Sequence, residues 1–151
     1  MLARAGRSAW RIVALVGLSA VVAGCNSPTS PTASPGFIQT DLRLGTGAEA
    51  VAGSVVTVEY TGWFYDASKP DQKGVQFDTS TGREALTFIV GVGQVIAGWD
   101  QGITGMRVGG MRRLVIPPSL AYGGTRVGLI PPNTTLLFDV ELLGVAETAG
   151  S

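Results

Sequence analysis

The chain has 151 residues, of which 45% are hydrophobic, and its 11 Lys and Arg balance its 11 Asp and Glu. It contains no His and one Cys, which excludes an internal disulfide, a Cys/His zinc site and the usual base of serine or cysteine catalysis. Three arginines lie within the first 11 residues, and the remaining chain carries 8 basic residues against 11 acidic ones. That balance argues against a nucleic-acid partner, which would require a basic face.

The first 24 residues have the pattern of a secretory signal. Arg4, Arg7 and Arg11 precede an uncharged run over 12–24, which is shorter than the about 20 residues that a membrane-spanning helix needs. The run ends in Val-Ala-Gly-Cys at 22–25, which resembles the lipobox of bacterial lipoproteins, whose cysteine is acylated. We therefore expect a signal peptide over 1–24, lipidation of Cys25, and a lipid-anchored protein of the bacterial cell envelope that faces the periplasm or the exterior. The alternative is a plain secretory signal with an unmodified Cys.

Residues 25–36 comprise the Cys and a run of small, uncharged residues rich in Ser, Thr and Pro, which predicts a flexible tether. Residues 147–151 form a small polar tail that we expect to be frayed. Between them, residues 37–146 suit one domain with a single core.

Most of this domain reads as strands. Val56, Val58 and Tyr60 alternate with polar residues, which is the pattern of a strand with one buried face. In the last strand, Leu136 and Phe138 begin a longer alternation of the same kind. The predicted strands cover 38–44, 56–61, 75–79, 86–90, 111–116 and 134–145. The polar stretch 66–74 interrupts them as a turn-rich loop.

One helix is predicted, over 93–103. Val95, Trp99 and Ile103 lie along one apolar face, and the opposite face, which includes Gly98, is small or polar. Each of the two glycines inside the helix costs about 1 kcal/mol relative to Ala, so tertiary packing must hold this helix. A short helix among antiparallel strands predicts an α+β domain with the helix across the concave face of the sheet.

Six motifs of this chain resemble, in order and approximate spacing, those of FKBP-type peptidyl-prolyl isomerases. They are Tyr60-Thr61-Gly62, Phe77-Asp78, Val95 to Trp99, Ala121-Tyr122-Gly123, Ile130-Pro131-Pro132 and Leu136 to Leu143. The resemblance covers about residues 53–145. It implies an FKBP-like α+β fold, a strongly curved antiparallel sheet of about five strands around one short helix, with an apolar pocket between them.

The implied reaction is rotation about X-Pro bonds in exported proteins, which breaks amide conjugation against a barrier of about 18–20 kcal/mol. It needs no nucleophile, proton shuttle or cofactor. A dry apolar site favours the twisted amide, which is less polar across its C–N bond than the planar form, and a few fixed donors add to this.

The resemblance also implies the residues of the site. Trp99 would be the pocket floor, and the walls would be Tyr60, Phe77, Val95, Ile96 and Phe138. The catalytic residues would be Asp78, Tyr122 and Ile96: the Ile96 N–H and the Tyr122 hydroxyl would donate to substrate carbonyls, and Asp78 would face the twisting amide. Arg83 would pair with Asp78, Leu129 and Ile130 would cover one rim, and Leu86 stands where the family often has an aromatic wall residue.

Each of these residues also has an ordinary structural interpretation. Trp99, Phe77 and Phe138 could be plain core, and Asp78 could cap a turn. The loop over 66–74 is longer than in the family and could be a surface insertion or a client contact. The alternative function is a binding or chaperone module that holds proline motifs without essential turnover. Expected partners are proline-containing polypeptides, macrolide inhibitors and, through the anchor, a membrane; we expect a monomer.

Overall fold

The computed structural model describes residues 34–146. The predicted signal peptide, Cys25 and the tail 147–151 lie outside the described residues. Within 34–146, no helix is long and apolar enough to cross a membrane. The elements are β1 (Ile38–Arg43), β2 (Val55–Tyr65), β3 (Lys73–Thr79), β4 (Leu86–Ile89), α1 (Ala97–Ile103), β5 (Met111–Ile116), a short 3-10 helix η1 (Pro118–Leu120) and β6 (Leu136–Ala146).

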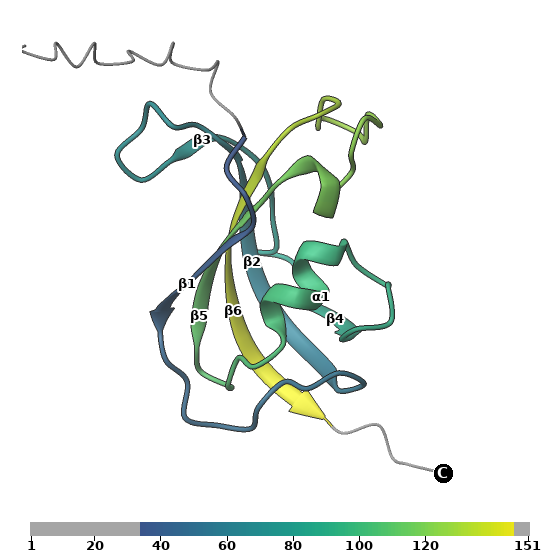
Figure 1. Ribbon diagram of the computed structural model, residues 1–151. Helices are drawn as coiled ribbons and strands as arrows, with labels where there is room; N and C mark the ends of the chain where they lie inside the picture. Colours follow the sequence, from purple (N-terminus) through teal and green to yellow (C-terminus); the bar gives the residue numbers. More distant parts are fainter. Residues whose placement is uncertain (1–33, 147–151) are drawn as a thin grey trace, which may run out of the picture. The chain divides into compact units, whose positions relative to one another are not determined.

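The strands form one antiparallel sheet in the order β1-β5-β6-β2-β3 (Figure 1). β4 pairs with the first part of β2, from Val55 to Val58, and β3 pairs with the last part, from Thr61 to Tyr65. β2 and β6 are the longest strands and pair along nearly their whole length. The predicted antiparallel sheet is confirmed, with six strands instead of about five.

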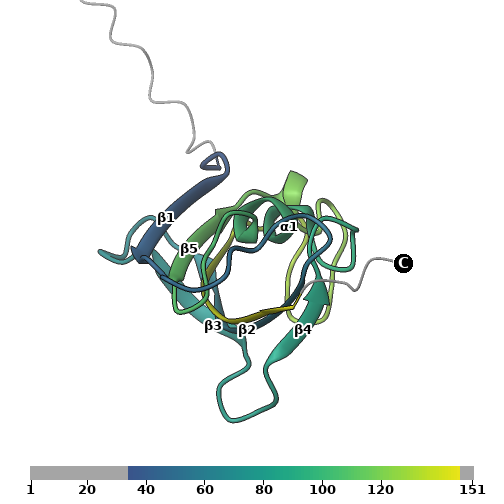
Figure 2. The same ribbon diagram turned by 90° about the horizontal axis from the view of Figure 1, so that it is seen from below.

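The sheet curves around α1, as the view along the strands shows (Figure 2). The predicted helix over 93–103 is confirmed in its second part only, because the helix begins at Ala97. Gly91 and Gly93 have φ values of 81° and 77°, in the left-handed region that glycine adopts readily and that a right-handed helix cannot include. The segment before Ala97 is therefore a loop, and it brings Val95 and Ile96 to the N-terminal end of the helix.

Gly98 and Gly102 lie on the side of α1 that packs against β5, which corrects the prediction that Gly98 lies on the small or polar face opposite the apolar one. A Cβ atom on Gly98 would lie 2.5 Å from Cγ2 of Ile116. A Cβ atom on Gly102 would lie 2.5 Å from Cδ2 of Leu114. Real side chains do not approach so closely, so the two glycines let the helix backbone rest directly on the strand.

The core lies between the concave face of the sheet and α1. Val56 and Val58 of β2 are fully buried, as the alternating pattern predicts. The predicted inner face of β6 is buried as well, and consists of Leu136, Phe138, Val140 and Leu142. Trp99 and Ile103 enter this core from the helix, which explains how a sequence with low helix propensity is held in place.

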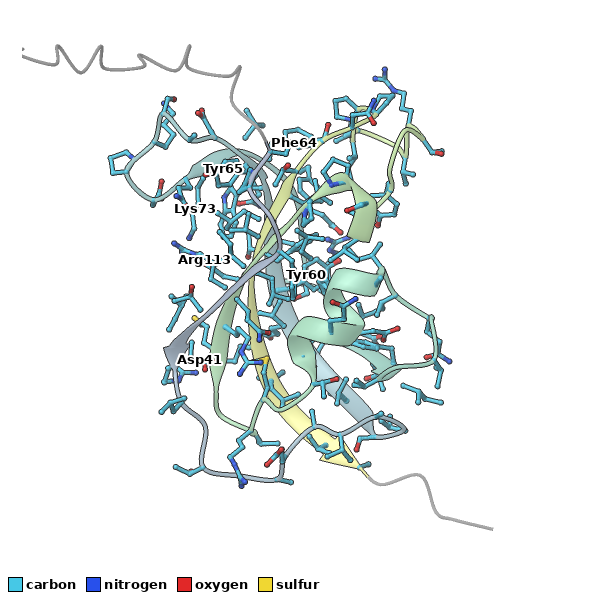
Figure 3. The ribbon with its side chains drawn as sticks, in the orientation of Figure 1. Asp41, Tyr60, Phe64, Tyr65, Lys73 and Arg113 are labelled. Atoms are coloured by element: carbon cyan, nitrogen blue, oxygen red, sulfur yellow. The ribbon has the colours of Figure 1, made fainter. Side chains whose placement is uncertain are left out.

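A network of charges lies on the other face of the sheet. Asp139 of β6 accepts two hydrogen bonds from Arg113 of β5, at 2.7 and 2.9 Å. It also forms an ion pair with Lys73 of β3, with 2.7 Å between the charged atoms. The Lys73 ammonium also lies 4.0 Å from the centre of the Trp63 ring. In Figure 3, Lys73 and Arg113 lie on the side of the sheet away from α1, whereas Tyr60 lies toward the helix. The network ties the central strand β6 to the start of β3, at the end of the 66–72 loop.

Candidate active site

A pocket of about 440 Å³ lies between α1, the concave face of the sheet and the loop that follows η1. It is lined mainly by aromatic and aliphatic side chains with a few polar groups, as ligand sites commonly are. The lining residues are Tyr60, Phe77, Asp78, Leu86, Gln94, Val95, Ile96, Trp99, Tyr122, Val127, Leu129, Ile130 and Phe138.

The pocket is lined by every residue that the sequence assigned to it except Arg83, which does not line the pocket but pairs with Asp78. Gln94 and Val127 also line the pocket, although the sequence pattern did not predict them. Gln94 directly precedes the apolar pair Val95-Ile96. Val127 faces Ile130 across a two-residue turn, an apolar pair that could have indicated a small hairpin in this loop.

Trp99 forms the floor of the pocket and is only 4% exposed. Its indole ring meets Tyr60 and Phe138 edge to face, with ring centres 5.0 and 5.3 Å apart. Such arrangements place the positive edge of one ring against the negative face of another. The indole Nε1 is buried and has no hydrogen-bond partner among residues 34–146, an arrangement that costs stability in a core and calls for an explanation.

Gly62 explains how the aromatic wall fits against β2. A Cβ atom at this position would lie 2.7 Å from Cε1 of Phe138 and 2.8 Å from Cζ of Phe77. The two rings meet edge to face with their centres 5.6 Å apart, and Phe77 also stacks on Phe64. The glycine of the Tyr-Thr-Gly motif is therefore required so that both rings can pack over the strand.

The carboxyl group of Asp78 is held by three donors. Its Oδ2 accepts from the Tyr60 hydroxyl at 2.7 Å. Its Oδ1 accepts from the backbone N–H of Thr79 at 2.9 Å and from Nη2 of Arg83 at 2.5 Å. Arg83 also donates to the carbonyl of Thr79, so the guanidinium clamps the end of β3. These contacts fix the orientation of the carboxyl group at the pocket wall.

The same contacts set the charge states at the wall. Partial burial pushes the pKa of Asp78 upward, but the hydrogen bonds from Tyr60, Arg83 and Thr79 outweigh it and hold the pKa below its usual value. Burial, followed by the hydrogen bond to the Asp78 carboxylate, raises the pKa of Tyr60 to about 12. At neutral pH the site therefore contains an anionic Asp78 and a neutral, donating Tyr60.

Two hydrogen-bond donors at the pocket have no acceptor among the described residues: the backbone N–H of Ile96 and the hydroxyl of Tyr122. Burial and the nearby Asp78 charge raise the pKa of Tyr122, so its hydroxyl keeps its proton at neutral pH. The backbone around it is fixed, because Ala121 and Gly123 both donate to the carbonyl of Pro118, at 3.0 and 2.8 Å. Both donors are available to a bound molecule.

One rim of the pocket is a tight hairpin turn. Val127 and Ile130 exchange backbone hydrogen bonds of 3.1 and 2.8 Å, and Gly128 between them has a φ of 54°. This turn holds Leu129 outward, 74% exposed, while Ile130 is buried beneath it. The rim thus offers an apolar contact to anything that enters the pocket.

The site can exclude water from a small apolar group and enclose that group between aromatic side chains. Its two available donors can bind carbonyl oxygens next to that group. Its carboxylate already accepts three hydrogen bonds and its pKa is lowered, so it is a weak proton acceptor. The arrangement suits binding and conformational catalysis.

Comparison with known proteins gives a consistent result. Residues 47–143 match the family described as FKBP-type peptidyl-prolyl cis-trans isomerase. An FK506-binding protein of Neisseria meningitidis serogroup B is 49% identical over 114 residues, which is 74% of this chain and 98% of that protein. FK506-binding protein 1 of Gibberella zeae is 47% identical over 108 residues, 71% of this chain and 96% of that protein.

Two solved structures are similar to the described domain. The crystal structure of FkpA from Escherichia coli has a TM-score of 0.64 and 41% sequence identity, and the match covers 78% of this chain and 51% of that one. This chain therefore matches only about half of FkpA. The crystal structure of AtFKBP13 has a TM-score of 0.60 and 42% identity, with 73% of this chain and 93% of that one covered.

Proposed function

Since the chain belongs to the FKBP-type peptidyl-prolyl cis-trans isomerase family, we propose that it catalyses the rotation of X-Pro bonds in exported polypeptides. The observation that carries this proposal is a single geometry. An aromatic floor, Trp99, lies beside two donors without acceptors in the described residues, the Ile96 N–H and the Tyr122 hydroxyl. The proline ring would rest on the floor, and the two donors would bind the adjoining carbonyls.

The mechanism follows from the apolar lining of the pocket and from its two fixed hydrogen-bond donors. Rotation of the X-Pro bond takes tens to hundreds of seconds without a catalyst, because amide conjugation must be broken. The twisted amide has less charge separation across its C–N bond than the planar amide, so an apolar pocket stabilises it relative to the ground state. Donors that are fixed before the substrate arrives hold the adjoining carbonyls in both the ground and the transition state, and they cost no reorganisation during the reaction.

Asp78 would supply a fixed charge beside the twisting amide and would not accept a proton. Its oxygens are occupied by Tyr60, Thr79 and Arg83, and its pKa is held low. The role that fits these facts is to orient the polar end of the pocket. Tyr60 then serves twice, since its ring packs on Trp99 while its hydroxyl anchors Asp78.

We propose that the same pocket binds FK506-type macrolides, because similar proteins carry the name FK506-binding protein. The alternative activity, holding proline motifs without essential turnover, is favoured by one observation. The exposed Leu129 and its neighbour Val127 offer apolar rim area that rotation itself does not need. Catalysis and binding can be separated by measurement.

The test combines both quantities on the piece of the chain from Pro35 onward. Isomerisation of a proline tetrapeptide is followed with and without FK506, and peptide affinity is measured separately. The isomerase proposal predicts acceleration that FK506 suppresses. Tight peptide binding with no acceleration would support the binding module in its place.

We also propose that the mature protein begins at a lipidated Cys25 and is anchored to the cell envelope. The support is the Val-Ala-Gly-Cys sequence after a basic and then apolar leader. Each buried CH₂ of an acyl chain contributes about 0.8 kcal/mol to membrane binding, so a multiply acylated Cys would hold the protein firmly at the membrane.

The substitution Cys25→Ser tests the anchor. It should remove the acylated species from the intact mass spectrum and should shift the protein out of the membrane fraction. A wild-type intact mass without an acyl group, or the same membrane partition in the two proteins, would contradict the anchor.

A further inference from the structure

The carboxyl group of Asp100 is hydrogen-bonded to the loop that precedes its own helix. Its Oδ1 accepts the backbone N–H of Gly91 at 2.8 Å, and its Oδ2 accepts the backbone N–H of Gly93 at 3.0 Å. Hydrogen bonds to a carboxylate are roughly twice as strong as neutral ones. Asp100 lies in the first turn of α1, so one side chain ties the helix to the loop on its N-terminal side.

The loop is shaped so that these amides can point at the helix. Gly91 and Gly93 both have positive φ values, 81° and 77°, which turns the chain back toward α1. The other end of the loop is fixed by Gln94, whose Oε1 accepts the N–H of Ile89 at 2.8 Å. Val90 donates to the carbonyl of Ser54 at 3.0 Å. The loop between β4 and α1 is therefore held at both ends.

Ile96 lies at the point where this loop becomes the helix. Its carbonyl accepts the backbone N–H groups of Trp99 and Asp100, at 2.9 and 3.3 Å, while no side chain caps the helix there. Asp100 thus holds Ile96 from two directions: its backbone binds the Ile96 carbonyl, and its carboxylate binds the loop that leads to the Ile96 nitrogen. The Ile96 N–H itself is left pointing at no acceptor within the described residues.

We propose that Asp100 is a positioning residue that sets the direction of the Ile96 N–H toward a substrate carbonyl. The proposal rests on the proposed isomerase function. Asp100 does not line the pocket, so it acts only through the loop. Because a displacement of about 1 Å in a positioned group can cost as much as 100-fold in rate, a loop held by two charge-assisted hydrogen bonds has a direct effect on the site.

A purely structural role for Asp100 has a different signature. An acidic residue in the first turn of a helix also interacts favourably with the helix dipole, and its loss would lower the folded fraction. Fewer folded molecules reduce the apparent kcat and leave KM unchanged. A misplaced donor to a carbonyl that binds equally in the ground and transition states raises KM and leaves kcat nearly unchanged.

The experiment uses Asp100→Asn in the full-length protein, with Gln101→Ala as the matched control. Gln101 is the exposed neighbour on the same helix and does not line the pocket. In Asp100→Asn one carboxylate oxygen becomes an NH₂ group that faces a backbone N–H.

For Asp100→Asn we expect the KM for a proline tetrapeptide to rise by about threefold to tenfold, while kcat stays within about twofold of the wild type. Amide exchange at Gly91 and Gly93 should speed up beyond the change in global unfolding, and FK506 affinity should fall in parallel. Gln101→Ala should match the wild type.

A KM within twofold of the wild type in a folded Asp100→Asn protein would overturn the proposal, as would a loss confined to kcat. If Asp100→Asn does not fold, Asp100→Ser, which can accept from only one of the two amides, gives the same readouts. If the wild type and the Gln101→Ala control show no isomerase activity, the proposed function fails. The positioning role is then judged by FK506 affinity alone, and an unchanged affinity in Asp100→Asn rejects it.

Discussion

The hydroxyl of Tyr60 donates a 2.7 Å hydrogen bond to Oδ2 of Asp78, and this contact joins the middle of β2 to the end of β3. The ring of Tyr60 packs edge to face on Trp99 at the same time. Tyr60 therefore connects the polar end of the pocket, at Asp78, to its apolar floor, at Trp99. A displacement of either residue is transmitted to the other through this one side chain.

Asp78→Asn and Tyr122→Phe should each leave the fold intact, because each changes little volume. Both remove polarity that the proposed mechanism places next to the substrate. Little full charge develops when an amide twists, so we expect a loss of about 1 kcal/mol or less in kcat/KM, well below the about 3–4 kcal/mol seen in dedicated oxyanion sites. Isomerisation rates and peptide affinities of both variants and of the double mutant give the measurement. A fall of several orders of magnitude in either folded single mutant would require a direct chemical role and would reject the desolvation mechanism.

Trp99→Leu should keep the fold and weaken substrate binding, since the aromatic floor is lost but an apolar side chain remains. Trp99→Ala should in addition lower the free energy of unfolding by about 3–5 kcal/mol, because Trp99 is a buried core residue and leaves a cavity. Denaturant unfolding and peptide affinity separate the two effects. Full isomerase activity of Trp99→Leu on every proline peptide tested would remove Trp99 from the site.

Gly98→Ala and Gly102→Ala should destabilise the domain although Ala favours helices. The added methyl groups would meet Ile116 and Leu114 at 2.5 Å, and such overpacking costs about 1–3 kcal/mol. Gln101→Ala, on the exposed face of the same helix, is the control and should be neutral or slightly stabilising. Thermal and denaturant unfolding test this. Stabilisation by either glycine substitution would show that α1 does not rest on β5 through these positions.

Asp139→Asn should lower the free energy of unfolding in a pH-dependent manner. Asp139 is only 14% exposed in its side chain. Burial pushes its pKa upward, but hydrogen bonds and ion pairs with Arg113 and Lys73 outweigh this and hold the pKa below its usual value. A depressed folded-state pKa contributes stability that is present above the unfolded pKa of about 3.9 and is lost as the pH falls through the folded pKa.

We therefore expect Asp139→Asn to cost about 1–3 kcal/mol near neutral pH, between the values for exposed and fully buried pairs. The difference from the wild type should shrink as the pH drops below about 4. Glu84→Gln, which removes an exposed carboxylate without an ion pair in the described domain, serves as the control. Urea unfolding between pH 3 and pH 7 provides the measurement. A difference that stays constant over this range would show that the charge of Asp139 does not stabilise the fold.

The strands, the inner face of β6 and the aromatic residues around the pocket could all be predicted from the sequence. These follow from alternation with a period of two and from motif order, which are local properties of the chain. Val56, Val58 and Leu136 are buried as their pattern predicts, and Trp99, Tyr60 and Phe138 meet as the resemblance implies.

Three features of α1 could be seen only in the folded domain: the residue at which the helix begins, the face that rests on the sheet, and the side chains that hold its loop. The sequence shows Gly98 as a weak helix former, and only the packing of β5 explains its presence. The role of Asp100 follows only from the backbone amides of Gly91 and Gly93 that donate to its oxygens. The charge network of Asp139 likewise joins residues from three strands. Contacts of this kind depend on which segments the folded sheet and helix bring together, and no periodicity along the chain encodes them.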